Sequence, residues 1–232
     1  MTVSVVLFDL DDTLFAHRAS VDRGIVAHLA AIGGYSDADP TALWHHLEEH
    51  HYHRYLAGEL DFEGQRRARA TDFAASQGFT LDDPSAWFNS YFEHYRAAWH
   101  LHDDTLPLLA ALTQRTGIIT NGDPAFQQRK LDQVGLSFEH VVASGSLGFT
   151  KPDARIFEHA VSLYGVAPSD ACYVGDRFET DALGAAAAGL LGVWLDRGGA
   201  ATDAQLARAA EAGVRVIHSL AELPDLLGSA ST

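Results

Sequence analysis

The stretch from Val3 to Asp12 constrains the fold more than any other part of the chain. Five of its first six residues are apolar, with β-branched valines among them, which is typical of a short buried strand. Three carboxylates then follow within four positions, at Asp9, Asp11 and Asp12. Like charges this close repel one another unless a cation shares them. We interpret the stretch as a central parallel strand that holds a divalent cation at its carboxyl end, where open α/β sheets bind ligands; the alternative is an acidic cap on a following helix.

The charge of the chain limits its partners. Its 232 residues include 31 acidic and 16 basic ones, which gives a formal net charge of −15. Such a surface repels polyanions, which argues against nucleic acid polymers and anionic membranes as partners. A small phosphorylated metabolite remains compatible, because a bound cation and local fields override net charge. The length suits one large domain or two small ones, and we expect a monomer or a homodimer.

The sequence favours a cytoplasmic location. Its one cysteine, Cys172, lies in a strand-like run, so we expect a buried, inert thiol and no intrachain disulfide. The first residues lack the basic region of a signal peptide, and their apolar run stops at Asp9. No apolar stretch is long enough to span a bilayer. A reducing compartment is the default for such a chain.

A helical pattern without a convincing strand fills residues 16–103. Apolar residues recur at helical spacing, and prolines or aspartates stand where helices would begin. The expected helices cover residues 21–32, 40–56, 61–77 and 82–99. Four helices in succession predict a small all-helical domain inserted after the first strand.

Strands and helices alternate after this insertion. Further strands are expected at residues 116–120, 140–144, 171–176, 191–195 and 214–217, and helices at 106–112, 126–134, 152–164 and 180–188. This alternation predicts an α/β fold with a Rossmann-like, doubly wound parallel sheet. The predicted core domain is made of residues 1–15 and 104–232. Right-handed crossovers then place the ends of the strands that carry Asp9, Thr120 and Asp176 at one edge of the sheet.

Four features gather at that edge. They are Asp9 with Asp11, then Thr120, then Lys151, and finally Asp176 with Asp181 five residues later. Each feature is weak alone, because a threonine after a strand or a lysine before proline is usually a turn or surface residue. Together they supply what phosphoryl transfer needs: a carboxylate to attack phosphorus, a second to move a proton, and cations to neutralise the phosphate oxygens.

In this order and context the four features resemble the haloacid dehalogenase-like hydrolase superfamily. The resemblance covers nearly the whole chain, and its first motif, D-x-D-x-T, is matched by Asp9-Leu10-Asp11-Asp12-Thr13. The resemblance implies an Mg²⁺-dependent phosphatase in which Asp9 is the nucleophile that becomes an aspartyl-phosphate. It also implies that Asp11 is the general acid for the leaving oxygen and then the base for the attacking water.

The resemblance assigns the remaining site residues as well. Thr120, with the backbone N–H groups of Asn121 and Gly122, would hold the phosphate. Lys151 would pair with the Asp9 carboxylate and with the phosphate charge. Mg²⁺ would be held by Asp9, by Asp176 and by the backbone carbonyl of Asp11, while Asp181 would lie beside these ligands.

Several activities within the superfamily remain open. Dehalogenases of this type lack the second aspartate, because a departing halide needs no proton, so Asp11 favours phosphate ester hydrolysis. The helical insertion resembles the cap of the family's first subclass, which closes over the site and selects the substrate. We expect a small nucleotide or sugar phosphate as substrate. The alternatives are a flavin mononucleotide or phosphoglycolate phosphatase, a β-phosphoglucomutase-like mutase, a 2-haloacid dehalogenase, and a catalytically silent binding protein.

Some residues depart from the family pattern or invite a second interpretation. Ser144-Gly145-Ser146 stands where an acidic pair often follows a serine, and Arg177 stands where serine is frequent. His46 and His50 share a helix face and could bind a second metal, although a solvated face is the favoured interpretation. The aromatic run from Trp87 to Tyr95 is expected in the core of the bundle rather than in a ring-stacking pocket.

Overall fold

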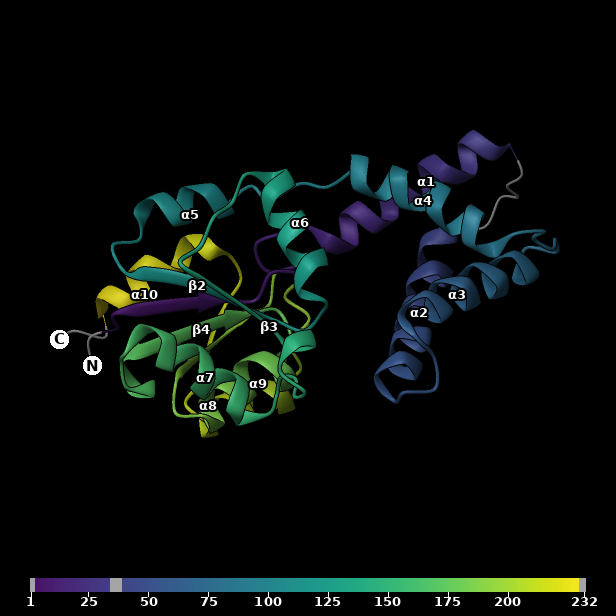
Figure 1. The fold of residues 1–232 in the computed structure, drawn as a ribbon. Helices are drawn as coiled ribbons and strands as arrows, with labels where there is room; N and C mark the ends of the chain where they lie inside the picture. Colours follow the sequence, from purple (N-terminus) through teal and green to yellow (C-terminus); the bar gives the residue numbers. More distant parts are fainter. Residues whose placement is uncertain (1–2, 34–38, 230–232) are drawn as a thin grey trace. The chain divides into compact units, whose positions relative to one another are not determined.

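The computed structural model describes residues 3–33 and 39–229 of the chain. The chain divides into two compact units. The first, which we call the α/β unit, comprises Met1–Ala16 and His100–Thr232, and the second, the helical unit, comprises His17–Trp99. Both are drawn in Figure 1.

The α/β unit is built on a parallel sheet of six strands in the order β3-β2-β1-β4-β5-β6. The strands are β1 (Val5–Phe8), β2 (Arg115–Thr120), β3 (His140–Ala143), β4 (Ala171–Gly175), β5 (Leu191–Leu195) and β6 (Arg215–Ile217). The doubly wound α/β fold expected from the sequence is therefore confirmed. All four residues of β1 are buried, as a central parallel strand requires.

The register of the sheet brings three polar strand ends together. Phe8, the last residue of β1, lies opposite Ile118 of β2 and Val174 of β4. Asp9 follows Phe8 directly, while Thr120 and Asp176 each lie two residues beyond those partners. Because the strands are parallel, these side chains emerge at the same edge of the sheet, on both sides of β1.

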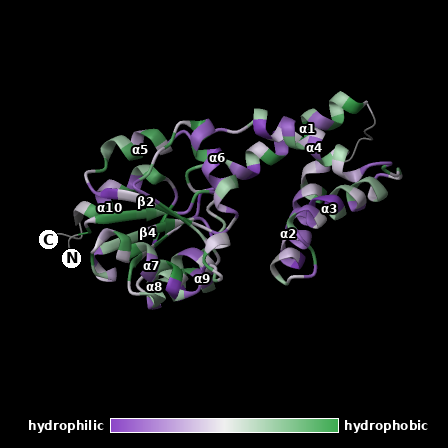
Figure 2. Ribbon diagram, in the orientation of Figure 1, coloured by the Kyte–Doolittle hydropathy of each residue, from purple (hydrophilic) through white to green (hydrophobic). Residues whose placement is uncertain are grey.

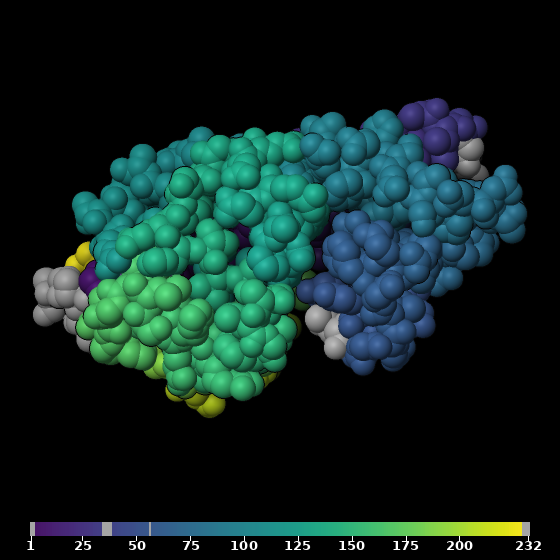
Figure 3. Space-filling view, viewed as in Figure 1, coloured from purple at the N-terminus to yellow at the C-terminus, as the bar shows by residue number. Residues whose placement is uncertain are grey.

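Helices cover the sheet and complete its core. In the α/β unit they are α5 (Thr105–Ala111), α6 (Pro124–Val134), α7 (Ala154–Tyr164), α8 (Gly184–Ala187), α9 (Asp203–Glu211) and α10 (Leu223–Ser229). The strands are coloured largely hydrophobic in Figure 2, and in Figure 3 little of the purple N-terminal segment of this unit is visible beneath its later segments. Ile156, Phe157 and Val161 of α7 pack on strand residues such as Tyr173. This packing buries an apolar helix face against the sheet.

The helical unit consists of four helices, three of which begin at a capping aspartate. They are α1 (His17–Ile32), α2 (Pro40–Leu56), α3 (Phe62–Ser76) and α4 (Pro84–Ala97). The side chains of Asp39, Asp61 and Asp83 accept hydrogen bonds from the first turns of α2, α3 and α4. The core of this unit is aromatic: the buried Trp44 ring packs edge-on against Tyr91 at a centroid distance of 4.7 Å.

The structure differs from the sequence-based expectation in the last third of the chain. Residues 180–188 were expected to form one helix, but a π-helical turn at Phe178–Leu183 precedes the short α8. Helices α9 and α10 were not expected, because the first is rich in alanine and the second is short. A capping box between Thr202 and Gln205 nevertheless starts α9.

Among the helices within residues 3–33 and 39–229, none combines the length and the apolar character that a membrane crossing requires.

Candidate active site

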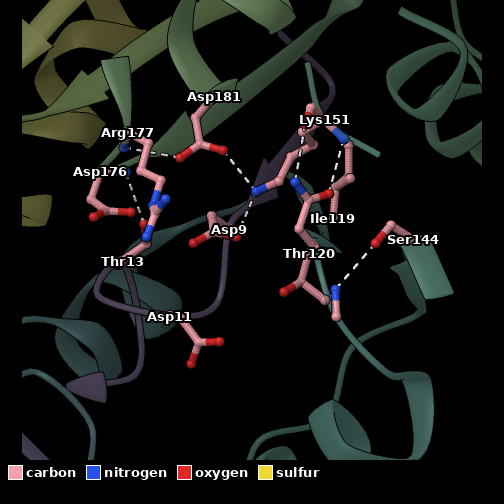
Figure 4. A network of polar contacts seen from close by, with 12 residues as sticks. Asp9, Asp11, Thr13, Ile119, Thr120, Ser144, Lys151, Asp176, Arg177 and Asp181 are labelled. Atoms are coloured by element: carbon pink, nitrogen blue, oxygen red, sulfur yellow. Dashed lines mark hydrogen bonds and ion pairs between the residues drawn. The ribbon is translucent and has the colours of Figure 1, made fainter. Parts of the chain in front are cut away.

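Asp9 directly follows strand β1, and its side chain is buried and hydrogen-bonded to a lysine. Asp9 Oδ1 accepts a hydrogen bond from Lys151 Nζ at 2.6 Å, and the Asp9 backbone N–H donates to Val174 O at 2.9 Å. Asp9 is 6% exposed and Lys151 5%. The carboxylate therefore has a fixed position at the centre of the edge, directly after the sheet's central strand (Figure 4).

The ammonium group of Lys151 is held by three acceptors, one of which is Asp9. Its Nζ also donates to Asp181 Oδ1 and to the hydroxyl of Tyr173, both at 2.7 Å. The Tyr173 hydroxyl in turn donates to Ile119 O at 2.8 Å. The three protons of an ammonium group thus each have a partner, so Lys151 is a fixed positive charge that faces Asp9.

The side chain of Asn121 fixes the backbone of Lys151. Asn121 Nδ2 donates to Lys151 O at 3.1 Å, and the Lys151 backbone N–H donates to Asn121 Oδ1 at 2.9 Å. Two opposed hydrogen bonds of this kind orient the segment that carries the lysine. The sequence predicted a role only for the backbone N–H of Asn121, so this use of its side chain was not foreseen.

Strand β4 ends at Gly175 and is followed by Asp176, and Asp181 from the π-helical turn lies near both. A Cβ at position 175 would lie 2.5 Å from the Asp181 carboxyl group, so only glycine fits there. The Asp176 backbone N–H donates to Thr13 Oγ1 at 3.1 Å, which ties β4 to the first motif. This close approach explains why a glycine directly precedes the aspartate.

Three carboxylates form a group that fits a metal cation. Oxygens of Asp9, Asp176 and Asp181 all lie within 4.8 Å of one another. Asp176 Oδ1 is buried and has no hydrogen-bond partner in the described part of the chain, which leaves it available as a ligand. By contrast, Asp181 Oδ1 accepts from Lys151, and Asp181 Oδ2 accepts from the Arg177 backbone N–H at 2.9 Å. This oxygen-only donor set suits a hard divalent cation.

The raised pKa values of the carboxyl groups also indicate a cation site. Burial, with further contributions from Asp181 and Asp11, outweighs Lys151 and raises the pKa of Asp9 from 3.8 to about 7. Burial and the nearby Asp9 and Asp181 raise the pKa of Asp176 from 3.8 to about 8. Burial alone would lower the pKa of Lys151, but Asp181 and Asp9 raise it above its ordinary value. The site therefore holds more negative charge than its lysine offsets, as expected where a cation binds.

The end of β2 carries Thr120 and a tight turn. Thr120 is buried, and its Oγ1 accepts from Gln127 Nε2 at 2.7 Å. The Gly122 backbone N–H donates to Ser144 Oγ at 3.2 Å, and the Gly145 backbone N–H donates to Gly122 O at 3.0 Å. The Ser144-Gly145-Ser146 segment therefore supports the loop after β2.

Asp11 lies beyond the buried group, and two residues absent from the sequence analysis contact it. Lys130 Nζ donates to Asp11 Oδ1 at 2.6 Å, and Gln127 Nε2 donates to Asp11 Oδ2 at 3.0 Å. Both donors belong to α6, three positions apart on one face. The three-residue spacing could have indicated that Gln127 and Lys130 act together. It was not distinctive, because polar residues at such spacing on a helix usually face solvent.

Arg177 and the histidines of the helical unit were also singled out by the sequence. Arg177 is exposed, and its charge lowers the pKa of Asp176, although burial and the neighbouring carboxylates outweigh it. The His46 and His50 rings stack at a centroid distance of 6.4 Å. Within the described residues, the one group of three potential metal ligands is Asp9, Asp176 and Asp181, so no third ligand joins these histidines.

Comparison with known proteins identifies the family. The model of the haloacid dehalogenase-like hydrolase family matches residues 3–189. The chain is 30% identical over 223 residues to a phosphoserine phosphatase of Thermus thermophilus, which covers 84% of this chain and 90% of that protein. It is also 30% identical over 204 residues to a glyceraldehyde 3-phosphate phosphatase of Methanopyrus kandleri, with 84% and 85% covered. The chain therefore belongs to the haloacid dehalogenase-like hydrolases, as its motifs predicted, and these curated relatives are phosphatases of small phosphate monoesters.

A solved structure supports the fold independently. The structure of a protein described as a HAD-hydrolase, YfnB of Bacillus subtilis bound to magnesium, superimposes with a TM-score of 0.80. The match covers 98% of this chain and 99% of that one at 20% identity. At this identity the likeness establishes the fold.

Proposed function

We propose that this protein hydrolyses a small phosphate monoester, of the sugar phosphate or nucleotide type, through an aspartyl-phosphate on Asp9. The observation that carries the proposal is the pairing of the buried Asp9 with Lys151 at 2.6 Å. Asp11 provides the second carboxylate that hydrolysis of a phosphate ester requires for proton transfer. A carboxylate attacks phosphorus only when it is ionised and held in place. Lys151 donates to the Asp9 carboxylate, which holds it in place, and its charge lowers the pKa of Asp9 against the effect of burial.

The first chemical step uses Asp9, Asp11 and Thr120. A carboxylate oxygen of Asp9 bonds to phosphorus while the ester P–O bond breaks. Asp11 gives its proton to the leaving oxygen, which departs as an alcohol. The Thr120 hydroxyl and the backbone N–H groups of Asn121 and Gly122 are proposed to bind the phosphate oxygens. Gly122 would exchange its bond to Ser144 Oγ for a bond to phosphate.

The second step returns the enzyme to its starting state. Water attacks the phosphorus of the aspartyl-phosphate, and Asp11, now a carboxylate, takes the water's proton. The bond between Asp9 and phosphorus breaks, and inorganic phosphate leaves. Lys151 stays beside Asp9 throughout and stabilises the carboxylate that is released.

The proposed cofactor is Mg²⁺, held by Asp9, Asp176 and the backbone carbonyl of Asp11. When bound, it supplies positive charge that offsets the repulsion between the Asp9 carboxylate and the phosphate. Asp181 is proposed to lie outside the ligand set, because its two oxygens are bonded to Lys151 and to the Arg177 backbone. Its part is to hold Lys151 in place.

The helical unit is proposed to select the substrate. The predicted cap, residues 16–103, is inserted between the segment that carries Asp9 and the segment that carries Thr120. The α/β unit supplies the groups for phosphoryl transfer, which leaves recognition of the rest of the substrate to the helical unit. We also propose a cytoplasmic location, because the only cysteine, Cys172, is buried and forms no disulfide. We propose a monomer or a homodimer, and size-exclusion chromatography distinguishes the two assemblies.

The experiment is phosphate release from a panel of monoesters with Mg²⁺ and with a chelator. The panel contains phosphoserine, glyceraldehyde 3-phosphate, sugar phosphates, nucleotides, flavin mononucleotide and phosphoglycolate, and the Asp9→Asn protein is the blank. Mg²⁺-dependent release by the wild type, absent in the variant, supports the proposal. Isomerised sugar phosphate in place of free phosphate indicates a mutase. Silence of the folded wild type on the whole panel refutes the proposal.

A further inference from the structure

We infer that Lys130 and Gln127, on the helix after Thr120, are positioning residues that hold Asp11 in the orientation from which it transfers its proton. The inference rests on the proposed function of Asp11. It concerns two residues outside the motifs that identify the family.

The contact between α6 and Asp11 is built from buried donors. Lys130 is 1% exposed and Gln127 2%, yet both carry polar groups that are expensive to bury. The hydrogen bonds that their side chains donate in the described chain run to the site: Lys130 Nζ to Asp11 Oδ1, and Gln127 Nε2 to Asp11 Oδ2 and Thr120 Oγ1. The Gln127 amide oxygen is buried and has no partner there. A lysine held in the core for stability alone has no need to point at this particular carboxylate.

The ammonium group of Lys130 lies near two aromatic rings. Lys130 Nζ lies 5.1 Å from the centroid of the Phe15 ring and 4.9 Å from that of Phe126. Ring faces attract a cation and narrow its range of positions. The two rings therefore restrict the position of the ammonium group independently of Asp11, so the ammonium group can orient the Asp11 carboxylate.

Gln127 joins two parts of the proposed mechanism through one nitrogen. The amide has two N–H bonds, and Nε2 lies 3.0 Å from Asp11 Oδ2 and 2.7 Å from Thr120 Oγ1. The amide nitrogen, not the oxygen, faces Asp11, because a carboxylate oxygen needs a donor. The distance between the proton-transferring group and the proposed phosphate-binding hydroxyl is fixed by this bridge.

Two donors, one on each oxygen, fix the plane of the Asp11 carboxyl group. Each carboxyl oxygen has a second lone pair, so one of them still carries the proton that the leaving oxygen takes. Once that proton has left, Lys130 stabilises the new negative charge, and the carboxylate is ready to take a proton from water. Loss of either donor lets the carboxyl group rotate away from this geometry, and proton transfer tolerates little misplacement.

This inference has a signature that a purely structural role lacks. Proton donation matters for an ester whose leaving oxygen is strongly basic and matters little for one whose leaving oxygen is weakly basic. p-Nitrobenzyl phosphate and p-nitrophenyl phosphate form a matched pair, since they are similar in size but release a basic alkoxide oxygen and an acidic phenol. The value of kcat/KM includes only the steps up to loss of the leaving group, so it isolates Asp11 acting as an acid.

The experiment compares kcat/KM for both esters in the wild type, Lys130→Met, Gln127→Leu and Asp11→Asn, each with Mg²⁺. Arg129→Met and Gln128→Leu are matched controls, because both positions are exposed on the same helix and receive the same substitutions. Thermal unfolding followed by circular dichroism checks that every variant is folded. Asp11→Asn sets the full effect of losing the acid.

We expect Lys130→Met and Gln127→Leu to lower kcat/KM for p-nitrobenzyl phosphate by about 10-fold or more, while p-nitrophenyl phosphate changes far less. The controls should match the wild type on both esters. Equal losses on the two esters, or no loss on either, overturn the inference even if the wild type is an active phosphatase. A wild type that hydrolyses neither ester and is silent on the metabolite panel refutes the proposed function instead.

Discussion

Replacing Lys151 with methionine tests the electrostatics of the buried carboxylates. The ammonium group donates to Asp9 at 2.6 Å and to Asp181 and Tyr173 at 2.7 Å. The side chains of Asp9 and Asp181 are 9% and 1% exposed, so water cannot replace the lost donor. Methionine fills a similar volume but leaves two carboxylates facing each other without a counter-charge.

The expected loss is large and depends on pH. Removing one partner of a buried ion pair costs about 3–5 kcal/mol of unfolding free energy. Burial raises the pKa of Asp9 from 3.8 to about 7 even with Lys151 present, and the variant raises it further. A carboxyl group with a raised pKa stabilises the folded state below its unfolded pKa, and this stability is lost as pH rises through the folded pKa. The penalty should therefore be greatest near pH 8 and smaller near pH 5.

The assay is urea unfolding in the presence of a chelator, at about pH 5 and about pH 8, with Lys130→Met as the matched control. Lys130 is also buried, but its partner Asp11 has a side chain that is 28% exposed and keeps some hydration. The Lys130→Met control should lose roughly 1 kcal/mol of unfolding free energy, which is in the range of an ordinary hydrogen bond. A loss below about 1 kcal/mol for Lys151→Met at the higher pH, or the same loss at both pH values, refutes this reasoning.

Three further predictions follow from the same contacts. Asp9→Asn should abolish phosphate release while circular dichroism shows an unchanged fold; release at the wild-type rate removes Asp9 from the chemistry. Without metal, the wild type should lose unfolding free energy as pH rises from about 4 to about 8, because the pKa values of Asp9 and Asp176 are raised to about 7 and about 8. Added Mg²⁺ should then raise the melting temperature more at pH 8 than at pH 5, and an equal rise at both would count against a carboxylate site. Tyr173→Phe removes the hydroxyl between Lys151 and Ile119 O, so it should cost about 1 kcal/mol in urea unfolding and lower kcat; an unchanged protein would show that the hydroxyl positions nothing.

The sequence alone predicted the sheet and the edge at which the site lies. Apolar runs of strand length end in Asp9, Thr120 and Asp176, and parallel strands must present their carboxyl ends on one side. Helices with proline or aspartate at their start were predicted for the same reason: capping is a local effect that the sequence displays directly. Helices α9 and α10 were missed because their short apolar patterns resemble surface loops.

The bonds that hold the site in place could not be predicted in the same way. Gln127 and Lys130 have the spacing of a solvated helix face, and only the tertiary structure shows that they turn inward and reach Asp11. Tyr173 has the pattern of an ordinary strand residue, yet its hydroxyl reaches Lys151. Contacts between residues far apart in the chain depend on the tertiary structure, whereas motifs at strand ends depend on local sequence.

The most direct test of the central claim, an aspartyl-phosphate on Asp9, is a burst experiment with the Asp11→Asn protein and p-nitrophenyl phosphate. This ester needs little proton donation, so Asp9 should still take up the phosphoryl group, whereas water attack should be slow without the Asp11 base. The account predicts a stoichiometric burst of p-nitrophenolate and, after acid quenching, a phosphoryl group on the peptide that contains Asp9. The absence of both the burst and the modified peptide, in a protein whose wild type hydrolyses the ester, would contradict it.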